Sequence, residues 1–317
     1  MTGDEFSGIA GFSTGSQRYI CTYAPTGLTP PTANSLLSIG SISKSFTGML
    51  LADMVYRGEV ELDDCVASLL SPAALSECWN NVTLADLATH QAGVPTIPPN
   101  LTGPPWDPYR GWSTERLYEA ASLVRFRRPS RPIRGLYSNF GFAVLAEALS
   151  RRAATSYPSL LESRVLQPLR LSKTTLADLV SETIATGCGA GAPRIRPWEF
   201  GAMTGAAGLA STVGDLLTVG DAIVGSRSDT SIDISGLRQC CQLPAATASR
   251  QFDMRLGWMI NQTSVGSIFW ASGQVSGMAT LLMLQIQARV VLVIAVTDSC
   301  AEELVCIGAG VLVRTLG

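Results

Sequence analysis

The chain has 317 residues, of which 46% are hydrophobic and 15% are charged, and its formal net charge is -2. This composition predicts a globular protein with a large core, built as one large domain or as two closely packed lobes. The net charge gives no electrostatic basis for binding nucleic acid, whose binders usually carry a strongly basic face.

The elements predicted along the chain begin with a short β-like run at residues 20–23 and a turn-rich stretch at residues 24–34. An amphipathic helix that begins at Ser41 follows, and Arg57 and Gly58 suit its last turn and its C′ position. Further helices are expected at residues 83–89, 114–124, 140–152, 213–224 and 301–316. Strands are expected at residues 267–271, 279–285 and 290–296.

The simplest assembly of these elements is an α+β fold, in which both ends of the chain build an antiparallel sheet flanked by helices and a helical lobe is inserted between them. We expect a sheet-and-helix lobe from residues 1–60 and 205–317 and a mainly helical lobe from residues 61–204, with the active site between the two.

The most apolar late segment, residues 278–297, contains Gln285, Gln287 and Arg289. It therefore predicts two buried strands joined by a turn and no membrane span. No basic region followed by an apolar stretch opens the sequence, which favours a cytoplasmic protein, or a secreted one if a leader is removed.

The eight cysteines show no CxxC spacing, and His90 is the only histidine. We therefore expect no metal site, and we interpret the cysteines as small buried thiols.

The strongest chemical signal is Ser41-Ile42-Ser43-Lys44, one of only two places where lysine occurs. Residues three apart lie on the same face of a helix, so Lys44 is expected beneath the Ser41 hydroxyl. A serine hydroxyl is a poor nucleophile until a base takes its proton, and a lysine can be that base if burial destabilises its ammonium. An ordinary capped helix with an amphipathic lysine is the alternative interpretation of so short a motif.

A longer set of motifs, taken in order, resembles the serine β-lactamase and penicillin-binding-protein superfamily. Residues 37–48 resemble its nucleophile segment, most closely in the branch of class C β-lactamases, carboxylesterases and related acyltransferases, and Tyr137-Ser138-Asn139 matches its second catalytic motif, Y-x-N. Further landmarks match at residues 58–64, 87–95, 167–169, 208–212 and 256–258. The resemblance runs from about residue 15 to the C-terminus and implies the β-lactamase/transpeptidase-like fold.

This resemblance implies that Ser41 is acylated, that Lys44 is its base partner and that Tyr137 is a second proton carrier. A Lys44 ammonium close to Tyr137 is expected to lower the pKa of the phenol. Asn139 is expected to hold both Lys44 and the substrate through its amide.

The third motif of the family departs from its pattern, because the strand reads Trp270-Ala271-Ser272-Gly273-Gln274. Ser272 and Gly273 fit, and the Gln274 N–H is expected to complete an oxyanion hole with the Ser41 N–H. Ala271 replaces the lysine or histidine of the family, and an alanine cannot pair with a substrate carboxylate.

These residues predict a serine hydrolase or acyltransferase that needs no cofactor and acts on a small-molecule ester or thioester. A β-lactamase or D-amino-acid peptidase is the alternative, and a sensor that is acylated without turnover is a second one. No G-x-S-x-G elbow supports an α/β-hydrolase, and His90 is expected to be a structural hydrogen-bonding residue.

Two further groups of residues have alternative interpretations. Trp106, Tyr109 and Trp112, together with Trp270, are candidates for the substrate pocket, and core packing is the competing explanation. A basic run precedes Tyr137 and comprises Arg125, Arg127, Arg128, Arg131 and Arg134. It either forms a solvated loop or binds the phosphate of a carrier-protein or coenzyme A thioester donor.

Overall fold

The computed structural model describes residues 6–15, 17–27, 29–70, 75–127, 136–180, 198–226, 233–243, 253–275, 277–297 and 299–317. Its strands are β1 (Gly8–Thr14), β2 (Gln17–Tyr23), β3 (Leu37–Ser38), β4 (Thr175–Leu176), β5 (Leu209–Ser211), β6 (Asp253–Arg255), β7 (Trp258–Thr263), β8 (Gly266–Val275), β9 (Met278–Gln285) and β10 (Val290–Thr297). Its α-helices are α1 (Ser43–Tyr56), α2 (Val66–Leu69), α3 (Leu84–Ala88), α4 (Thr114–Leu123), α5 (Asn139–Arg152), α6 (Tyr157–Leu161), α7 (Thr204–Ala207), α8 (Val213–Val224), α9 (Ser235–Arg238) and α10 (Ala301–Leu316). Short 3-10 turns are η1 (Gly40–Ile42), η3 (Glu77–Trp79), η5 (Ala177–Leu179), η6 (Gly201–Met203) and η7 (Gln239–Cys241), and η4 (Glu162–Leu166) is a π-helix.

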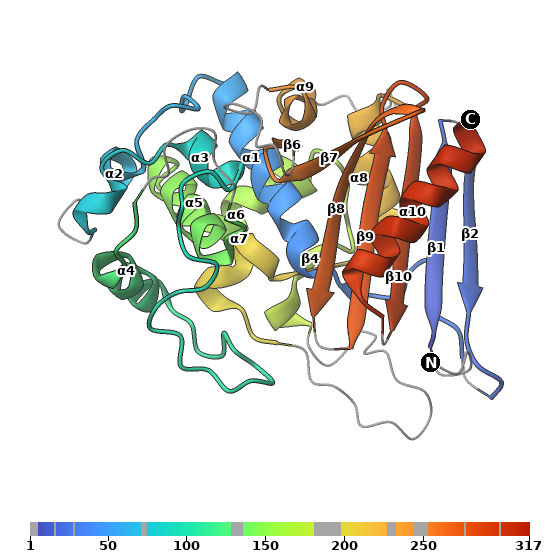
Figure 1. Ribbon diagram of the computed structural model, residues 1–317, viewed down its shortest axis with the longest axis horizontal. Helices are drawn as coiled ribbons and strands as arrows, with labels where there is room; N and C mark the ends of the chain where they lie inside the picture. The colour runs from blue at the N-terminus through green and yellow to red at the C-terminus, as the bar shows by residue number, and fades with distance from the viewer. Residues whose placement is uncertain are drawn as a thin grey trace.

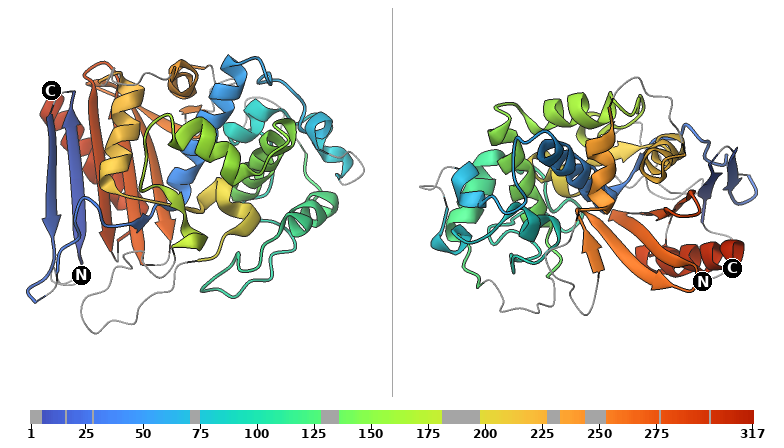
Figure 2. Two further views of the ribbon diagram at one scale, coloured as in Figure 1. Left: turned by 180° about the vertical axis from the view of Figure 1, so that it is seen from behind. Right: turned by 90° about the horizontal axis from the view of Figure 1, so that it is seen from above.

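Seven of the described strands form one antiparallel sheet in the order β2-β1-β10-β9-β8-β7-β6. The N-terminal hairpin pairs with β10, so the sheet is built from both ends of the chain, as the sequence predicts. The C-terminal helix α10 lies across one face of the sheet and α8 covers the other, which is clearest in the two views of Figure 2. The sheet therefore has apolar side chains on both faces.

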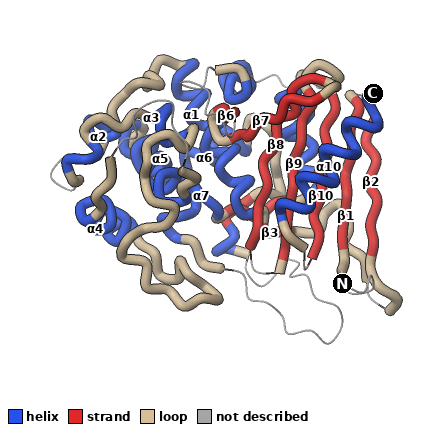
Figure 3. The backbone as a smooth tube through the Cα atoms, in the orientation of Figure 1, coloured by secondary structure: helices blue, strands red, loops and turns tan. Residues whose placement is uncertain are grey.

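The helical part of the molecule lies beside the sheet, on the side of β6 and β7 (Figure 1). Figure 3 shows α2 to α7 gathered there around α5, with α1 between them and the sheet. A second, three-stranded sheet of short strands in the order β3-β5-β4 joins residues that are far apart in the sequence.

The amphipathic pattern predicted for the first long helix is wrong, because α1 is buried on every side from Ser43 to Met54. Its neighbours include α5, α7 and α9 as well as β7. Polar side chains are tolerated inside this helix only because each finds a partner: Thr47 bonds the Gly205 carbonyl, and Asp53 bonds Arg57.

The end of α1 is confirmed in detail. Gly58 has a φ of +68°, and the Gly58 and Glu59 N–H groups bond the carbonyls of Val55 and Met54. This pattern satisfies carbonyls that the last turn of a helix leaves without partners. Helix α8 agrees with the helix expected at residues 213–224, and Thr212 caps it by accepting the Asp215 N–H.

Residues 278–297 form β9 and β10, as expected. None of the helices in the described ranges has the length and apolarity that a membrane span requires. The expectation of buried thiols is wrong in part: Cys240 and Cys241 are buried, but Cys21 and Cys306 are exposed, while Cys188 lies outside the described residues.

Candidate active site

The prediction that Ser41 begins the long helix is wrong. Ser41 lies in the 3-10 turn η1, just before α1. The Ser43 hydroxyl holds this junction, since it donates to the Gly40 carbonyl at 2.7 Å and accepts from the Leu209 N–H at 3.1 Å. Strand β5 thereby fixes the junction between η1, which holds Ser41, and α1. The tighter turn still brings Lys44 to Ser41, because residues three apart also lie above one another in a 3-10 helix.

Lys44 is 2% exposed, and its Nζ lies within hydrogen-bond distance of three oxygens. These are Ser41 Oγ at 2.9 Å, Asn139 Oδ1 at 2.7 Å and the Ala206 carbonyl at 2.7 Å. Burial lowers the pKa of Lys44 well below its usual value, because the low-dielectric surroundings disfavour the ammonium.

An uncharged amine has two N–H donors and one lone pair. The carbonyl oxygens of Asn139 and Ala206 can only accept, so they take the two N–H groups of Lys44. In the uncharged amine the remaining lone pair then points to the Ser41 hydroxyl, whereas an ammonium donates to Ser41 Oγ across the same 2.9 Å. The contacts of Lys44 therefore suit both sides of a proton transfer between Ser41 and this amine.

Tyr137 lies on the other side of this pair, with Lys44 Nζ 4.8 Å from its ring centroid. The expectation of a lowered phenol pKa is wrong. Burial raises the pKa of Tyr137 to about 12, and a hydrogen bond with Ser41 lowers it by less than burial raises it. Desolvation by burial is thus the largest influence on this phenol, and it outweighs the neighbouring Lys44 amine.

His90 supports this motif from behind, as predicted for a structural residue. Its Nδ1 accepts the Ser138 N–H at 3.0 Å, and its ring lies 4.3 Å from that of Tyr137 between centroids. Burial lowers the pKa of His90 well below its usual value, so the ring is neutral. The Ser138 hydroxyl donates to the Pro95 carbonyl and caps α5 at the Gly141 N–H, which orients Tyr137 and Asn139 on either side of it.

The edge of the main sheet meets η1 at the third motif. Strand β8 pairs with β9 as far as Val275, but its last partner on β7 is at Trp270, so the described β7 leaves the end of β8 uncovered. A Cβ on Gly273 would lie 1.9 Å from the Ile39 carbonyl, and a Cβ on Gly40 would lie 3.0 Å from the Gln274 nitrogen. Glycine at both positions thus lets the Gln274 nitrogen lie against Gly40, the residue before Ser41.

The side chains of the third motif divide between the two faces of the sheet. Ala271 is 5% exposed and packs in the main core, on the face that η1 meets. Trp270 packs with the α10 cluster on the opposite face and donates to Asn261 at 3.2 Å. The structure therefore places Trp270 away from the candidate pocket. The Gln274 side chain also lies on the α10 face, where its Oε1 accepts the Ala301 N–H at 3.1 Å.

The three aromatic residues of the proline-rich loop also separate. Trp106 is 71% exposed and Trp112 is 2% exposed, which makes the first a surface residue and the second a packing residue. Tyr109 reaches the site, because its hydroxyl accepts the Asn139 Nδ2–H at 3.0 Å. Its ring packs near Trp198 and Phe200, with centroids 6.3 and 6.1 Å away.

The basic run is described only at its start. Arg125 and Arg127 are exposed, and Arg125 bonds the carbonyls of Ser122 and Val124, which agrees with a solvated loop for these two residues. Arg128, Arg131 and Arg134 lie outside the described residues.

One support of the site was missed by sequence reasoning. The Ala206 carbonyl belongs to α7, whose position is held by a hydrogen bond from Thr47 Oγ1 to the Gly205 carbonyl at 2.7 Å. The Tyr157 hydroxyl lies 2.7 Å from the same Thr47 oxygen, and burial raises the pKa of Tyr157 above its usual value. A backbone acceptor carries no side-chain signal, so only the packing of α7 against α1 reveals it.

The fold and the Ser41, Lys44 and Tyr137 arrangement agree with a match to the family model for β-lactamases, which covers residues 14–306. The chain therefore belongs to the β-lactamase family, within the superfamily of serine β-lactamases and penicillin-binding proteins.

Among curated relatives, the chain is 29% identical over 151 residues to a β-lactamase of Escherichia coli K12. This alignment covers 46% of the chain and 36% of that relative. It is 27% identical over 217 residues to the D-alanyl-D-alanine-carboxypeptidase/endopeptidase AmpH of the same strain, covering 64% of the chain and 53% of AmpH. The chain thus matches only about a third to a half of the length of these proteins.

Solved structures share the fold over nearly the whole chain. A class C β-lactamase from Rhodobacter sphaeroides superimposes with a TM-score of 0.82 at 19% identity, covering 98% of this chain and 95% of the other. A β-lactamase/D-alanine carboxypeptidase from Pseudomonas syringae gives a TM-score of 0.80 at 15% identity, with 96% and 93% covered. These likenesses confirm the β-lactamase/transpeptidase-like fold expected from the sequence.

Proposed function

We propose that this protein is a serine acyl-transfer enzyme that forms an acyl-enzyme on Ser41 and cleaves or transacylates a small uncharged ester or thioester. The set of contacts around Lys44 Nζ carries the proposal. Two carbonyl oxygens accept from Nζ and Ser41 Oγ lies 2.9 Å away, so the uncharged amine has a lone pair for the Ser41 proton. No cofactor is needed for this chemistry.

In the acylation step, Lys44 removes the Ser41 proton as Oγ bonds to the acyl carbon. The negative charge moves to the acyl oxygen, where the N–H groups of Ser41 and Gln274 stabilise it. The tetrahedral intermediate then expels the alcohol or thiol, which takes up a proton from Lys44 directly or through Tyr137. Since burial raises the pKa of Tyr137 to about 12, the phenol stays protonated and serves as a donor to the leaving group.

Deacylation uses the same groups in reverse roles. Water or an acceptor hydroxyl gives its proton to Lys44 and attacks the acyl carbon, which restores free Ser41 and releases an acid or a new ester. Hydrolysis and transfer differ only in which nucleophile enters.

The uncharged substrate class is supported by Ala271, which is buried in the core where the family pattern has a lysine or histidine. A substrate carboxylate at this place meets no cation from the strand, and it forfeits a charge-assisted hydrogen bond. The names of the relatives, a β-lactamase and a D-alanyl-D-alanine carboxypeptidase, support the second candidate, a hydrolase of β-lactams or D-amino-acid peptides. A carrier-protein or coenzyme A thioester as the acyl donor is part of the first candidate.

The test of the acyl-enzyme uses a fluorophosphonate, p-nitrophenyl esters and intact-mass measurement. The wild-type protein is expected to gain one adduct at Ser41, and Ser41→Ala is expected to lose the adduct and at least about a thousandfold in rate on the esters. Ser163→Ala, which changes an exposed serine, is the matched control and should behave like wild type.

Full turnover by Ser41→Ala would refute covalent catalysis. A stable acyl adduct from a p-nitrophenyl ester, without release over many hours, would refute turnover and identify a sensor.

A further inference from the structure

We propose that Tyr109 is a positioning residue that holds the Asn139 amide so that the Lys44 lone pair is directed at Ser41. This inference rests on the proposed function, since it concerns the base of the same acyl-transfer reaction. It assigns to the loop before α4 a role in proton transfer that neither the S-x-x-K nor the Y-x-N motif contains.

The observation is a continuous chain of hydrogen bonds from the loop to the nucleophile. Asn139 Nδ2 donates to the Tyr109 hydroxyl at 3.0 Å, and Lys44 Nζ lies 2.7 Å from Asn139 Oδ1 and 2.9 Å from Ser41 Oγ. Both ends of one amide are therefore used, one on the base and one on Tyr109. An amide held at both ends has little freedom to rotate.

The direction of the amide matters because of what Lys44 becomes during the reaction. When Lys44 takes the Ser41 proton it has three N–H donors and no lone pair, so it needs an acceptor at Asn139. Oδ1 supplies this acceptor only while Nδ2 points away. An amide turned the other way presents Nδ2–H to Lys44, where it competes with Ser41 for the lone pair before the transfer and opposes the ammonium after it.

Tyr109 is itself held rigidly enough to act as this anchor. Its ring packs near Trp198 and Phe200, and its carbonyl accepts the Trp112 N–H at 2.9 Å. The Asp107 carboxylate of the same loop accepts the Glu199 N–H at 3.0 Å, which ties the loop to the neighbouring segment.

Within the described residues, the titratable groups close to the base are Tyr137, His90 and Tyr109. Burial raises the pKa of both phenols and lowers that of His90. All three are therefore neutral near pH 7 to 9. A change in the pH profile of a Tyr109 variant in that range accordingly reports on Lys44.

The test compares pH profiles of kcat/KM for a p-nitrophenyl ester in wild type, Tyr109→Phe, Asn139→Ala and the double variant. The wild-type rate is expected to rise with pH as Lys44 loses its proton, on a limb that lies below the usual lysine range. Tyr109→Phe keeps the ring and removes the hydroxyl. It should lower the plateau about tenfold and move the rising limb to lower pH, because an unanchored Asn139 stabilises the Lys44 ammonium less.

The double variant, Tyr109→Phe with Asn139→Ala, tests whether Tyr109 acts through Asn139. If Tyr109 acts through Asn139, removing its hydroxyl in the Asn139→Ala background should change neither the plateau nor the limb further. Additive losses would refute the positioning role and leave Tyr109 as a packing or substrate-contacting residue. Tyr118→Phe, which removes a phenol hydroxyl bonded to Glu147 on another face of α5, is the matched control and should show the wild-type profile.

The outcomes also separate this inference from the proposed function. A Tyr109→Phe profile equal to wild type, with fluorophosphonate labelling of Ser41 intact, would refute only the inference. Loss of Ser41 dependence would refute the proposed function itself.

Discussion

At the residue scale, the proposed substrate preference depends on Ala271. It lies opposite Leu282 of β9 and packs in the main core, so its position faces the same side of the sheet as η1. A lysine introduced there would be charged when a substrate carboxylate pairs with it, because the ion pair offsets the desolvation that burial imposes on a lone ammonium. A lysine at position 271 would supply the carboxylate partner that the strand lacks.

We expect Ala271→Lys to raise kcat/KM for a chromogenic cephalosporin relative to a p-nitrophenyl ester. A charge-assisted hydrogen bond is worth about 1.5–3 kcal/mol, which corresponds to roughly a tenfold to hundredfold change in the ratio. Ala271→Met has a similar length without the charge and should leave the ratio unchanged.

Efficient cephalosporin hydrolysis by the wild-type protein would contradict the ester preference and favour the β-lactamase candidate. If cephalosporin hydrolysis persisted after Arg131 and Arg134 were replaced by uncharged residues, the basic run would also be excluded as an anchor for the substrate carboxylate.

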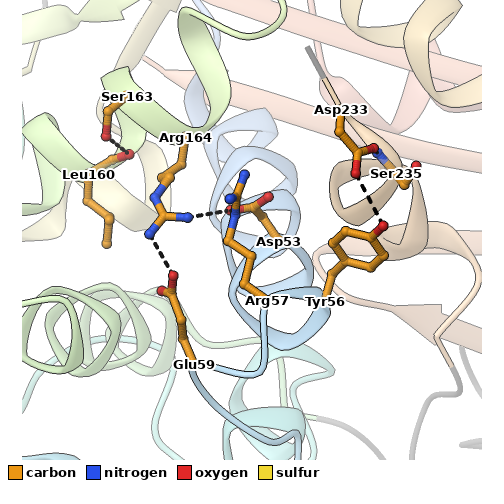
Figure 4. A network of polar contacts seen from close by, with 9 residues as sticks. All are labelled: Asp53, Tyr56, Arg57, Glu59, Leu160, Ser163, Arg164, Asp233 and Ser235. Carbon is orange, nitrogen blue, oxygen red and sulfur yellow. Dashed lines mark hydrogen bonds and ion pairs between the residues drawn. The ribbon is translucent and has the colours of Figure 1, made fainter.

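At the scale of elements, α1 is anchored at the end that lies away from Ser41. Asp53, whose side chain is 3% exposed, accepts from Arg57 Nε at 2.8 Å and lies 3.3 Å from Arg164 Nη1 of the π-helix η4. Arg164 Nη2 also bonds Glu59 at 2.6 Å, so one guanidinium joins two carboxylates of α1 and its C-terminal turn (Figure 4). Because η4 follows α6 directly, this network fixes how the helical layer packs on α1.

We expect Arg164→Met to lower the free energy of unfolding by about 1.5–3 kcal/mol, since it removes charged hydrogen bonds and leaves Asp53 with one partner. Urea denaturation followed by circular dichroism measures this loss. Arg151→Met, at an arginine whose side chain is 57% exposed and paired with Glu147 one turn earlier, is the matched control and should cost no more than about 1 kcal/mol. Equal losses in the two variants would show that the network adds nothing beyond a surface ion pair.

At the scale of the whole molecule, the site depends on how the sheet docks against η1 and α1. Thr280 of β9 lies opposite Gly273 of β8, and its hydroxyl is 3.1 Å from the Ile39 carbonyl and 3.3 Å from the Gly273 carbonyl. One buried hydroxyl thus links the sheet edge to the residue before Gly40. We therefore expect the spacing of the Ser41 and Gln274 N–H groups to depend on this link.

We expect Thr280→Val, which keeps the shape and removes the hydroxyl, to lower kcat on p-nitrophenyl esters about tenfold or more. The reason is that a small displacement of oxyanion donors weakens transition-state stabilisation more than substrate binding. KM should change little, and Thr280→Ser should restore most of the rate. A Thr280→Val enzyme with wild-type kcat would show that backbone packing alone aligns the two N–H groups.

Much of this architecture follows from local pattern. The spacing of Ser41 and Lys44 is sufficient for their contact, because a helical turn brings residues three apart together whatever surrounds them. The helix end at Gly58 depends on a few neighbouring residues and was predictable for the same reason. The strands β9 and β10 follow from two apolar runs separated by polar residues.

The sequence by itself therefore determined the contact between Ser41 and Lys44 and the main elements, whereas the tertiary structure decided their environment. The Ala206 acceptor lies 162 residues from Lys44, and no local pattern joins them. Trp270 and Ala271 must face opposite sides of a strand, but both faces of this sheet are covered, so the alternation cannot tell which side meets the site. The raised pKa of Tyr137 and the lowered pKa of Lys44 likewise come from desolvation, and desolvation exists only once distant segments have packed around a group.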